Sequence, residues 1–492
     1  MGKSKKNNKA KYFVIAGILI ALIILLVKSC PGPGGFEQKF KLFSKDGRIT
    51  IEEEDGLKQI YEGNTFDKDL KELADAENPK VILESRIKLI DTSKYNMNVF
   101  LEVGPSMNGY FNAQNSEFKD QFFNLITNLS LEPFYDTLEL FYSNVIPKAQ
   151  NNDKFSVRVA DLRGNIQIMQ KNFNSRLIKT NFNKFKIQKV RNTTKFDEIF
   201  NEIFEHHISS KNGAIFISDC IPSYKNALDA LVALKNRIKI VLATTIKDKD
   251  LVTIAFRLES KFAGGKYWDY LDQEHDANWS SRPYYVILVA SRKHMKKLIK
   301  EDLLSQKKFK YTNKMICEIA KSKKIDIKIN AKALCGSFNK KYVRNLSLYD
   351  AKIGSNRRGS SQSLKFEVAM DMSDYILESE FIKSIKNYSV SDNNYKILSV
   401  KKLRDNVNYP NKDYMMTIET KSGIRKTNLT IKLNPSLPNW VDEFHSIDDT
   451  GIENDQEEKK KTFGIKYILK GIYDGYHYKE KPFGTFTIKI KS

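Results

Sequence analysis

One short stretch constrains the fold more than any other part of the sequence. Residues 99–101 are apolar, Glu102 follows them, and the loop Gly104-Pro105-Ser106 leads to a polar, helix-forming run that begins near Ser116. An apolar strand that ends in an acidic residue and a Gly/Ser loop before a helix is how open α/β sheets build a site at a strand's carboxyl edge. We therefore predict a buried strand over residues 97–102, followed by a functional loop.

The alternation of strand-like and helix-like segments predicts an α/β domain over residues 96–306. The predicted strands are 97–102, 137–142, 165–169, 214–218, 238–243 and 284–290, and the predicted helices are 117–130, 195–207, 225–235 and 292–304. Strands separated by helices imply a mostly parallel, Rossmann-like sheet that is covered on both faces. An insertion at residues 251–282 contains a Gly-Gly turn and is expected to form a hairpin.

Three motifs in this domain resemble the von Willebrand factor type A (vWA) family. That family places D-x-S-x-S after its first strand, a Thr in a later loop and an Asp at the end of its fourth strand. The matching segments here are Glu102-Val103-Gly104-Pro105-Ser106, the loop with Thr194, and Asp219 after strand 214–218. The resemblance covers somewhat under half of the chain. It implies that Glu102, Ser106, Thr194 and Asp219 form a metal-ion-dependent adhesion site for Mg²⁺ or Mn²⁺.

Two positions depart from the family pattern. Glu102 is one methylene longer than the family's Asp, and Gly104 lacks the hydroxyl of the family's first Ser. Hard divalent cations need several oxygens at about 2.1–2.5 Å, so both changes are expected to weaken metal binding. Two expectations therefore stay open: a partial metal site, or a degenerate one whose side chains cap loops and hydrogen-bond each other.

The N-terminus predicts a membrane anchor. Residues 1–11 are polar and basic, and residues 12–28 contain an apolar run that spans roughly 24 Å as a helix. The lysines before this run favour an N-in, single-pass orientation, with the rest of the chain periplasmic or extracellular. Three alternatives stay open, and all predict this location for the rest of the chain: an uncleaved signal anchor, a lipoprotein signal at Cys30 and a cleaved signal. Frequent Lys, Asn and Ile residues are typical of a bacterial, AT-rich genome, which places the anchor in a bacterial inner membrane.

The remaining segments complete the predicted organisation. Residues 29–35 are expected to be a Pro/Gly tether, 36–95 a lead-in module, 307–362 a connecting region and 363–492 a β-sandwich-like domain of short antiparallel strands. Cys317 and Cys335 are able to pair if the domain lies outside the cytoplasm. The predicted fold class is thus α/β, a parallel-sheet vWA-like domain between an N-terminal transmembrane helix and a C-terminal sandwich.

Charge and absent motifs narrow the function classes. The net charge of +23 is mostly dispersed, and no nucleic-acid recognition motif accompanies it. No G-x-S-x-G, P-loop, H-E-x-x-H or C-x-x-C motif occurs, so we predict a protein that is not an enzyme. The main hypothesis is a membrane-anchored protein that docks another envelope protein, in a homo- or hetero-oligomeric assembly such as a secretion or injection machine. The alternatives are a metal-dependent hydrolase that uses Glu102 and Asp219, and a binder of anionic envelope polymer.

Overall fold

The computed structural model describes two compact units, residues 1–94 and 95–492. The described residues are 41–45, 48–52, 58–62, 88–90 and 94–491, except 149–153, 164–172, 224–227, 247–248, 356–361, 404–408 and 422–423. The predicted tail, anchor and tether at residues 1–35, with Cys30, lie outside them. Among the helices that the structure describes, none has the length and apolar character that a membrane crossing needs.

The first unit contains an antiparallel sheet in the order β1-β2-β3-β4. Its strands are β1 (Lys41–Lys45), β2 (Arg48–Glu52), β3 (Lys58–Glu62) and β4 (Lys88–Ile90). Each strand pairs with the next one along the chain, which is the simplest antiparallel arrangement.

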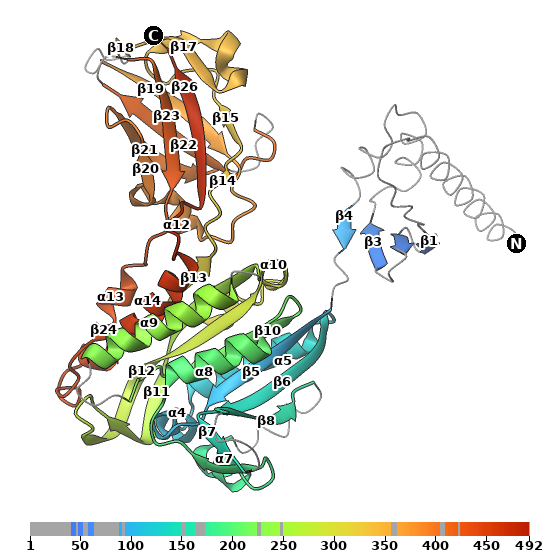
Figure 1. Cartoon of the computed structure of the whole chain (residues 1–492), viewed down its shortest axis with the longest axis vertical. Helices are drawn as coiled ribbons and strands as arrows, with labels where there is room; N and C mark the ends of the chain where they lie inside the picture. The colour runs from blue at the N-terminus through green and yellow to red at the C-terminus, as the bar shows by residue number, and fades with distance from the viewer. Residues whose placement is uncertain are drawn as a thin grey trace, which may run out of the picture. The chain divides into compact units, whose positions relative to one another are not determined.

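The second unit begins with a seven-stranded mixed sheet in the order β13-β11-β12-β10-β5-β6-β8 (Figure 1). Its strands are β5 (Tyr95–Glu102), β6 (Tyr135–Ser143), β8 (Ser156–Asp161), β10 (Asn212–Ser218), β11 (Leu251–Trp268), β12 (Glu274–Ser291) and β13 (Asn313–Glu318). In this sheet only β10–β5 and β5–β6 are parallel; the other described pairings are antiparallel. Alternate residues of β5 face opposite sides, so Val99 and Leu101 join one core while Phe100 joins the other.

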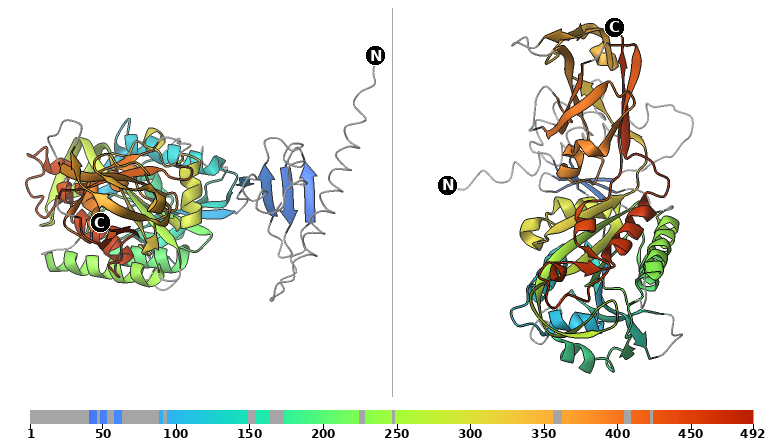
Figure 2. Two further views of the ribbon diagram at one scale, coloured as in Figure 1. Left: turned by 90° about the horizontal axis from the view of Figure 1, so that it is seen from above. Right: turned by 90° about the vertical axis from the view of Figure 1, so that its left-hand side faces the viewer.

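Helices cover both faces of this sheet. The helices are α4 (Asn108–Asn112), α5 (Glu117–Leu131), α7 (Ser175–Thr180), α8 (Phe196–Glu202), α9 (Leu228–Thr245), α10 (Arg292–Lys300), α11 (Gln306–Phe309) and α14 (Ile465–Tyr476). Helix α5 packs in the core of Val99, and α8 and α9 pack in the core of Phe100. Helix α14 lies beside α9, and both views place the two together (Figures 1 and 2).

The predicted parallel-sheet fold class is wrong. Residues 238–243 were expected to form a buried strand, but they are the second half of α9, whose buried residues Leu231, Leu234, Ile238 and Leu242 recur at helical spacing. The hairpin at 251–282 does form, but its two 18-residue strands run through the sheet itself and add antiparallel pairings. The described chain is mixed α/β, rich in strands that mostly pair antiparallel.

The C-terminal region is also more complex than a plain antiparallel sandwich. Two sheets, in the orders β16-β17-β26-β23-β20 and β15-β19-β22-β21, share one core. The strands are β14 (Lys323–Lys324), β15 (Ile327–Ile329), β16 (Ser337–Asn339), β17 (Ser347–Lys352), β18 (Gly354–Ser355), β19 (Gln362–Met370), β20 (Tyr388–Val390), β21 (Tyr395–Lys402), β22 (Tyr414–Thr420), β23 (Thr427–Leu433) and β26 (Gly484–Ile490). Strand β26 pairs in parallel with β14 and β17, which departs from the predicted antiparallel architecture.

Residues 435–482, here called the return segment, leave the two-sheet region and pack on the α/β part. They include α13 (Trp440–Glu443), β24 (His445–Ser446), η5 (Glu458–Lys460), β25 (Thr462–Phe463) and α14. Trp440, Phe463 and Leu469 join the core of Phe100. The α/β part therefore does not end at the predicted boundary at 306, because β13 extends its sheet to Glu318. It also includes the return segment, which lies beyond the predicted boundary at 363.

Two fully buried arginines on the hairpin hold the return segment. Arg257 donates to the backbone oxygen of Lys460 at 2.7 Å and to Glu259 Oε1 at 2.7 Å. Arg282 donates to the backbone oxygens of Lys459 and Lys461, at 3.2 and 3.0 Å. We call Arg257 and Arg282 the arginine pair. Their guanidinium groups fix the position of η5 against the hairpin.

Candidate functional site

The structure brings the four predicted site residues together at one edge of the sheet. Strands β5 and β10 are parallel neighbours, so Glu102 and Asp219 emerge at the same edge. The Thr194 hydroxyl donates to Glu102 Oε1 at 2.7 Å, and the Ser106 hydroxyl lies close enough to the Asp219 carboxylate to lower its pKa. Ser106 lies in η1 (Pro105–Met107), and Thr194 lies in the loop before α8.

Glu102 lies at the centre of this arrangement and has no exposed surface. Its second oxygen, Oε2, accepts a hydrogen bond from the Ser218 hydroxyl. Burial and the nearby charge of Asp219 raise the pKa of Glu102 to about 8, although the Ser218 and Thr194 hydroxyls act in the opposite direction. Glu102 is therefore mostly a neutral carboxylic acid at pH 7. We call Glu102, Ser106, Thr194, Ser218 and Asp219 the carboxyl cluster.

Asp219 is the second acid of the cluster and is also buried. Burial raises the pKa of Asp219 to about 6, against the lowering effect of the Ser106 hydroxyl, the Ile221 amide and Arg282. Its Oδ1 accepts from the Ile221 amide at 3.3 Å, and its Oδ2 has no hydrogen-bond partner in the part of the chain that the structure describes. At neutral pH the cluster therefore holds close to one negative charge, shared between two acids.

Sequence reasoning missed two residues of this site. Ser218 was only part of the strand before Asp219, and Asn144, which follows β6, belongs to none of the three motifs. The Asn144 amide donates to Thr194 Oγ1 at 3.1 Å, and Asn144 is itself buried. Ser218 ends β10 and Asn144 follows β6, the two parallel neighbours of β5, so both lie at the same edge as Glu102. This signal could have been found once β6 and β10 were placed beside β5.

This donor set does not fit the Mg²⁺ or Mn²⁺ ion that the resemblance implies. A Cβ atom at Gly104 would lie 2.7 Å from Glu102 Oε1 and 3.1 Å from Asn144 Nδ2. The longer Glu102 side chain thus fills the space that a serine at position 104 needs, and both its oxygens already accept hydroxyl protons. In the described residues, no three His, Cys, Asp or Glu side chains are grouped as metal ligands usually are.

The hairpin covers part of this edge. A Cβ atom at Gly265 would lie 2.3 Å from the Gly109 amide nitrogen, and one at Gly109 would meet the Phe262 ring at 2.4 Å. Only glycines permit this approach of β11 to α4. The hairpin therefore packs directly beside η1 and helps to keep Glu102 and Asp219 out of water.

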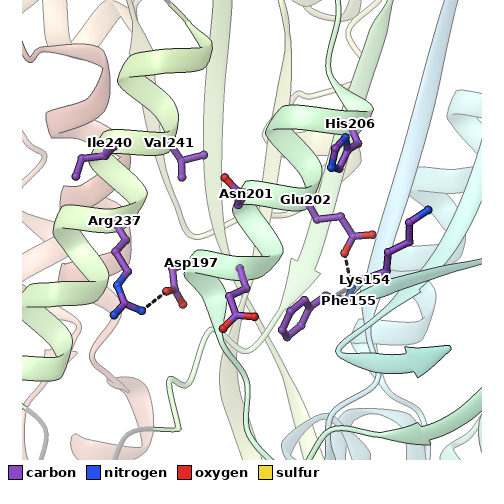
Figure 3. Close-up of a pocket in the computed structure, with 10 residues that line it drawn as sticks. Lys154, Phe155, Asp197, Asn201, Glu202, His206, Arg237, Ile240 and Val241 are labelled. Atoms are coloured by element: carbon purple, nitrogen blue, oxygen red, sulfur yellow. Dashed lines mark hydrogen bonds and ion pairs between the residues drawn. The ribbon is translucent and has the colours of Figure 1, made fainter. Parts of the chain in front are cut away.

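A pocket in the described part of the chain lies elsewhere, between α8 and α9 (Figure 3). It has a volume of about 880 Å³, and Ile240 and Val241 form one wall. Its main charged groups already have partners: Asp197 pairs with Arg237 at 2.7 Å, and Glu202 accepts the Phe155 amide at 2.6 Å. None of the carboxyl-cluster residues lines this pocket, so it gives the cluster no ligand-binding cavity.

Comparison with known proteins identifies no relative. No family model matches the chain, and neither a curated protein nor a solved structure is similar to it. The function of this chain therefore has to be inferred from the site itself.

Proposed function

We propose that this chain is a non-enzymatic docking protein, tethered to a bacterial inner membrane by residues 12–28, that binds another envelope protein through the loops around the carboxyl cluster. One observation carries the proposal: a buried, doubly hydrogen-bonded Glu102 ties the loops of β5, α8 and β10 together. A side chain used in this way fixes loop positions and is not available for reaction with a substrate. Fixed loops on a rigid sheet are well suited to protein recognition.

The surface that this proposal assigns to the partner is formed by three loops, residues 103–107, 191–195 and 219–223, here called the rim loops. Asn192, Thr193 and Ser223 are exposed, while Pro105 and Ser106 are half-buried. The Thr194 amide donates to Ser223 Oγ at 3.2 Å, so two of the loops also contact each other directly. The rim loops thus present small polar groups on a supported backbone.

Nothing observed favours the hydrolase alternative. Ser106, the hydroxyl in the nucleophile-like position, lies beside the Asp219 carboxylate. A serine nucleophile normally needs a base such as histidine within hydrogen-bond reach, and no described hydrogen bond joins Ser106 to a histidine.

Site-specific photocrosslinking in the native cells tests the docking proposal. A photoreactive amino acid at Thr193 or Ser223 should give an adduct with one and the same envelope protein, identified by mass spectrometry. The same probe at Lys396, exposed on β21, serves as a control position and should not give this adduct. Equal adducts from all three positions, or none from the rim, would contradict the proposal.

A paired variant tests whether the carboxyl cluster supports the rim. Thr194→Val removes the hydroxyl that bonds Glu102 and keeps the side-chain shape, so the adduct yield should fall about fivefold as the loops loosen. Thr244→Val makes the same change on the exposed face of α9, where the hydroxyl bonds only Ile240 O, and should leave the yield unchanged. Circular dichroism melting of both variants separates a loosened rim from an unfolded protein.

A further inference from the structure

Helix α10 has two faces of opposite character. His294, Met295 and Leu298 are buried on one side. Lys293, Lys296, Lys297 and Lys300 follow the spacing i, i+3, i+4, i+7, which places them on a single face opposite the buried side. We call these four residues the lysine face. Ile299 is 45% exposed beside it.

The positive surface continues beyond α10. Helix α11 adds Lys307 and Lys308, and Lys310 follows it. Lys308 Nζ donates to the backbone oxygen of Glu301 at 3.4 Å, which places α11 against the end of α10. Arg292 pairs with Asp250 and Glu318 and adds nothing to this surface. Residues 293–310 still contain seven Lys residues and only two acidic residues, so the charge is concentrated well above the dispersed excess of the chain.

The composition of this surface favours a lipid bilayer over other anionic partners. Long lysine side chains with one exposed aliphatic residue suit an interface between headgroups and acyl chains. Single-stranded nucleic acid is usually bound with exposed aromatic rings for base stacking. Phe309 is buried, and Tyr311 packs on Phe256 with the Lys314 ammonium above its ring.

Helix α10 packs beside the residue at which the second unit begins. Tyr95 is the first residue of the second unit, and its ring stacks on His294 of α10 with centroids 4.2 Å apart. The Tyr135 hydroxyl also bonds His294 Nε2 at 2.9 Å. The chain that arrives from the predicted anchor therefore enters this unit beside α10, and the buried side of the helix is fixed against the sheet.

We propose that the lysine face and α11 dock this unit onto anionic lipid headgroups of the membrane that holds the N-terminal anchor. The inference depends on the membrane tether of the proposed function but not on the rim loops. Contact with the bilayer would restrict the orientation of the unit and so limit the directions in which the rim can meet its partner.

Hydrogen exchange of the full chain in lipid nanodiscs tests this inference. Peptides from residues 292–310 should exchange about tenfold more slowly in discs that contain phosphatidylglycerol than in discs of phosphatidylcholine alone. Raised salt should remove the protection, because the attraction is electrostatic. Co-migration of the chain with phosphatidylcholine discs reports on the tether alone. A chain that does not co-migrate with them lacks a working anchor, whereas a chain that co-migrates but gains no protection from phosphatidylglycerol lacks a working lysine face.

Matched variants make the test specific. The triple variant K293Q/K296Q/K300Q should lose the protection, whereas K396Q/K401Q/K402Q, with the same charge change on exposed β21 residues, should keep it. Equal exchange in both kinds of disc, or equal loss in both triple variants, would overturn the inference. Protection by double-stranded DNA or an acidic polypeptide in solution, with none from anionic discs, would also overturn it in favour of another partner.

Discussion

Two of the regions in which the α/β part of this molecule buries charged groups stabilise those groups in different ways. In the carboxyl cluster, Glu102 accepts two hydroxyl donors, but burial and Asp219 outweigh their effect and raise its pKa, so it can give up its charge. In the arginine pair, burial alone would lower the pKa of Arg282, but Tyr267, Tyr110 and nearby acids outweigh that effect, and the guanidinium stays charged. Buried acids can adapt by protonation, whereas a buried guanidinium needs permanent acceptors. The first region should therefore respond to pH and the second to mutation.

The largest expected effect is on the arginine pair. Arg282→Met would leave the Lys459 and Lys461 carbonyls and the Tyr267 hydroxyl without their donor inside the protein. Breaking a buried charged contact of this kind typically costs about 3–5 kcal/mol. Urea unfolding at pH 7 should show this loss in the free energy of unfolding.

Arg237→Met is the matched control for this change. Arg237 bonds Asp197 at 2.7 Å. The arginine is 64% exposed and the aspartate 6%, so water can reach the Arg237 side of the pair and the loss should stay below that of Arg282→Met. Equal losses in the two variants would show that the backbone carbonyls of η5 find other donors, and the proposed contrast between buried and exposed arginines would fail.

The second prediction concerns the pH dependence that the carboxyl cluster gives to stability. The folded-state pKa of Glu102 is raised from 4.5 to about 8, so between these values the folded state binds a proton that the unfolded state has lost. Stability from this group is therefore complete below about pH 4.5 and is lost as pH rises to about 8. The loss should amount to a few kcal/mol, because each tenfold difference in proton affinity between the folded and unfolded states corresponds to roughly 1.4 kcal/mol.

Glu102→Gln isolates this contribution because the amide cannot titrate. We expect the wild type to lose unfolding free energy relative to Glu102→Gln as pH rises from 5 to 8. Chemical denaturation of both proteins at several pH values measures this difference. A difference that stays constant over this range would mean that Glu102 is ionised throughout, and the cluster would then resemble the arginine pair.

A third prediction tests whether Glu102 and Gly104 depend on each other. Gly104 has φ of −58°, which any residue can adopt, so steric contact alone opposes Gly104→Ala. The closest contact of the added Cβ is the Glu102 carboxylate at 2.7 Å, followed by Asn144 Nδ2 at 3.1 Å. We expect a loss of about 1–3 kcal/mol from overpacking. Adding Glu102→Asp withdraws the carboxylate by one methylene and should recover about 1 kcal/mol or more in a double-mutant cycle. Strict additivity would contradict this coupling.

The two regions also differ in how far the sequence predicts them. Convergence of Glu102 and Asp219 follows from two apolar strands that each end in an acid, because parallel neighbours end at one edge. The arginine pair gave no such signal: arginines in a strand pattern suggest exposure, and their acceptors are backbone oxygens of a distant segment. Sheet direction was missed because residues 238–243 are as apolar as a strand, although Ile238 and Leu242 continue the helical spacing of Leu231 and Leu234 and α9 packs against α14.

The smallest expected effect concerns His275, which contacts the return segment. His275 bonds Asp269 Oδ2 at 3.0 Å and Glu453 Oε1 at 2.9 Å, and so joins the hairpin to the return segment. Burial lowers the pKa of His275, but the two carboxylates outweigh this and raise it above 6.5. The cation therefore contributes stability that is complete below about pH 6.5 and is lost as pH rises through the raised value. His275→Gln should cost about 0.5 kcal/mol at pH 6 and nothing near pH 9, because solvent screens a half-buried pair. Urea unfolding at both pH values checks this, and a cost as large as that of Arg282→Met would show that charge, rather than burial, sets the strength of contacts to the return segment.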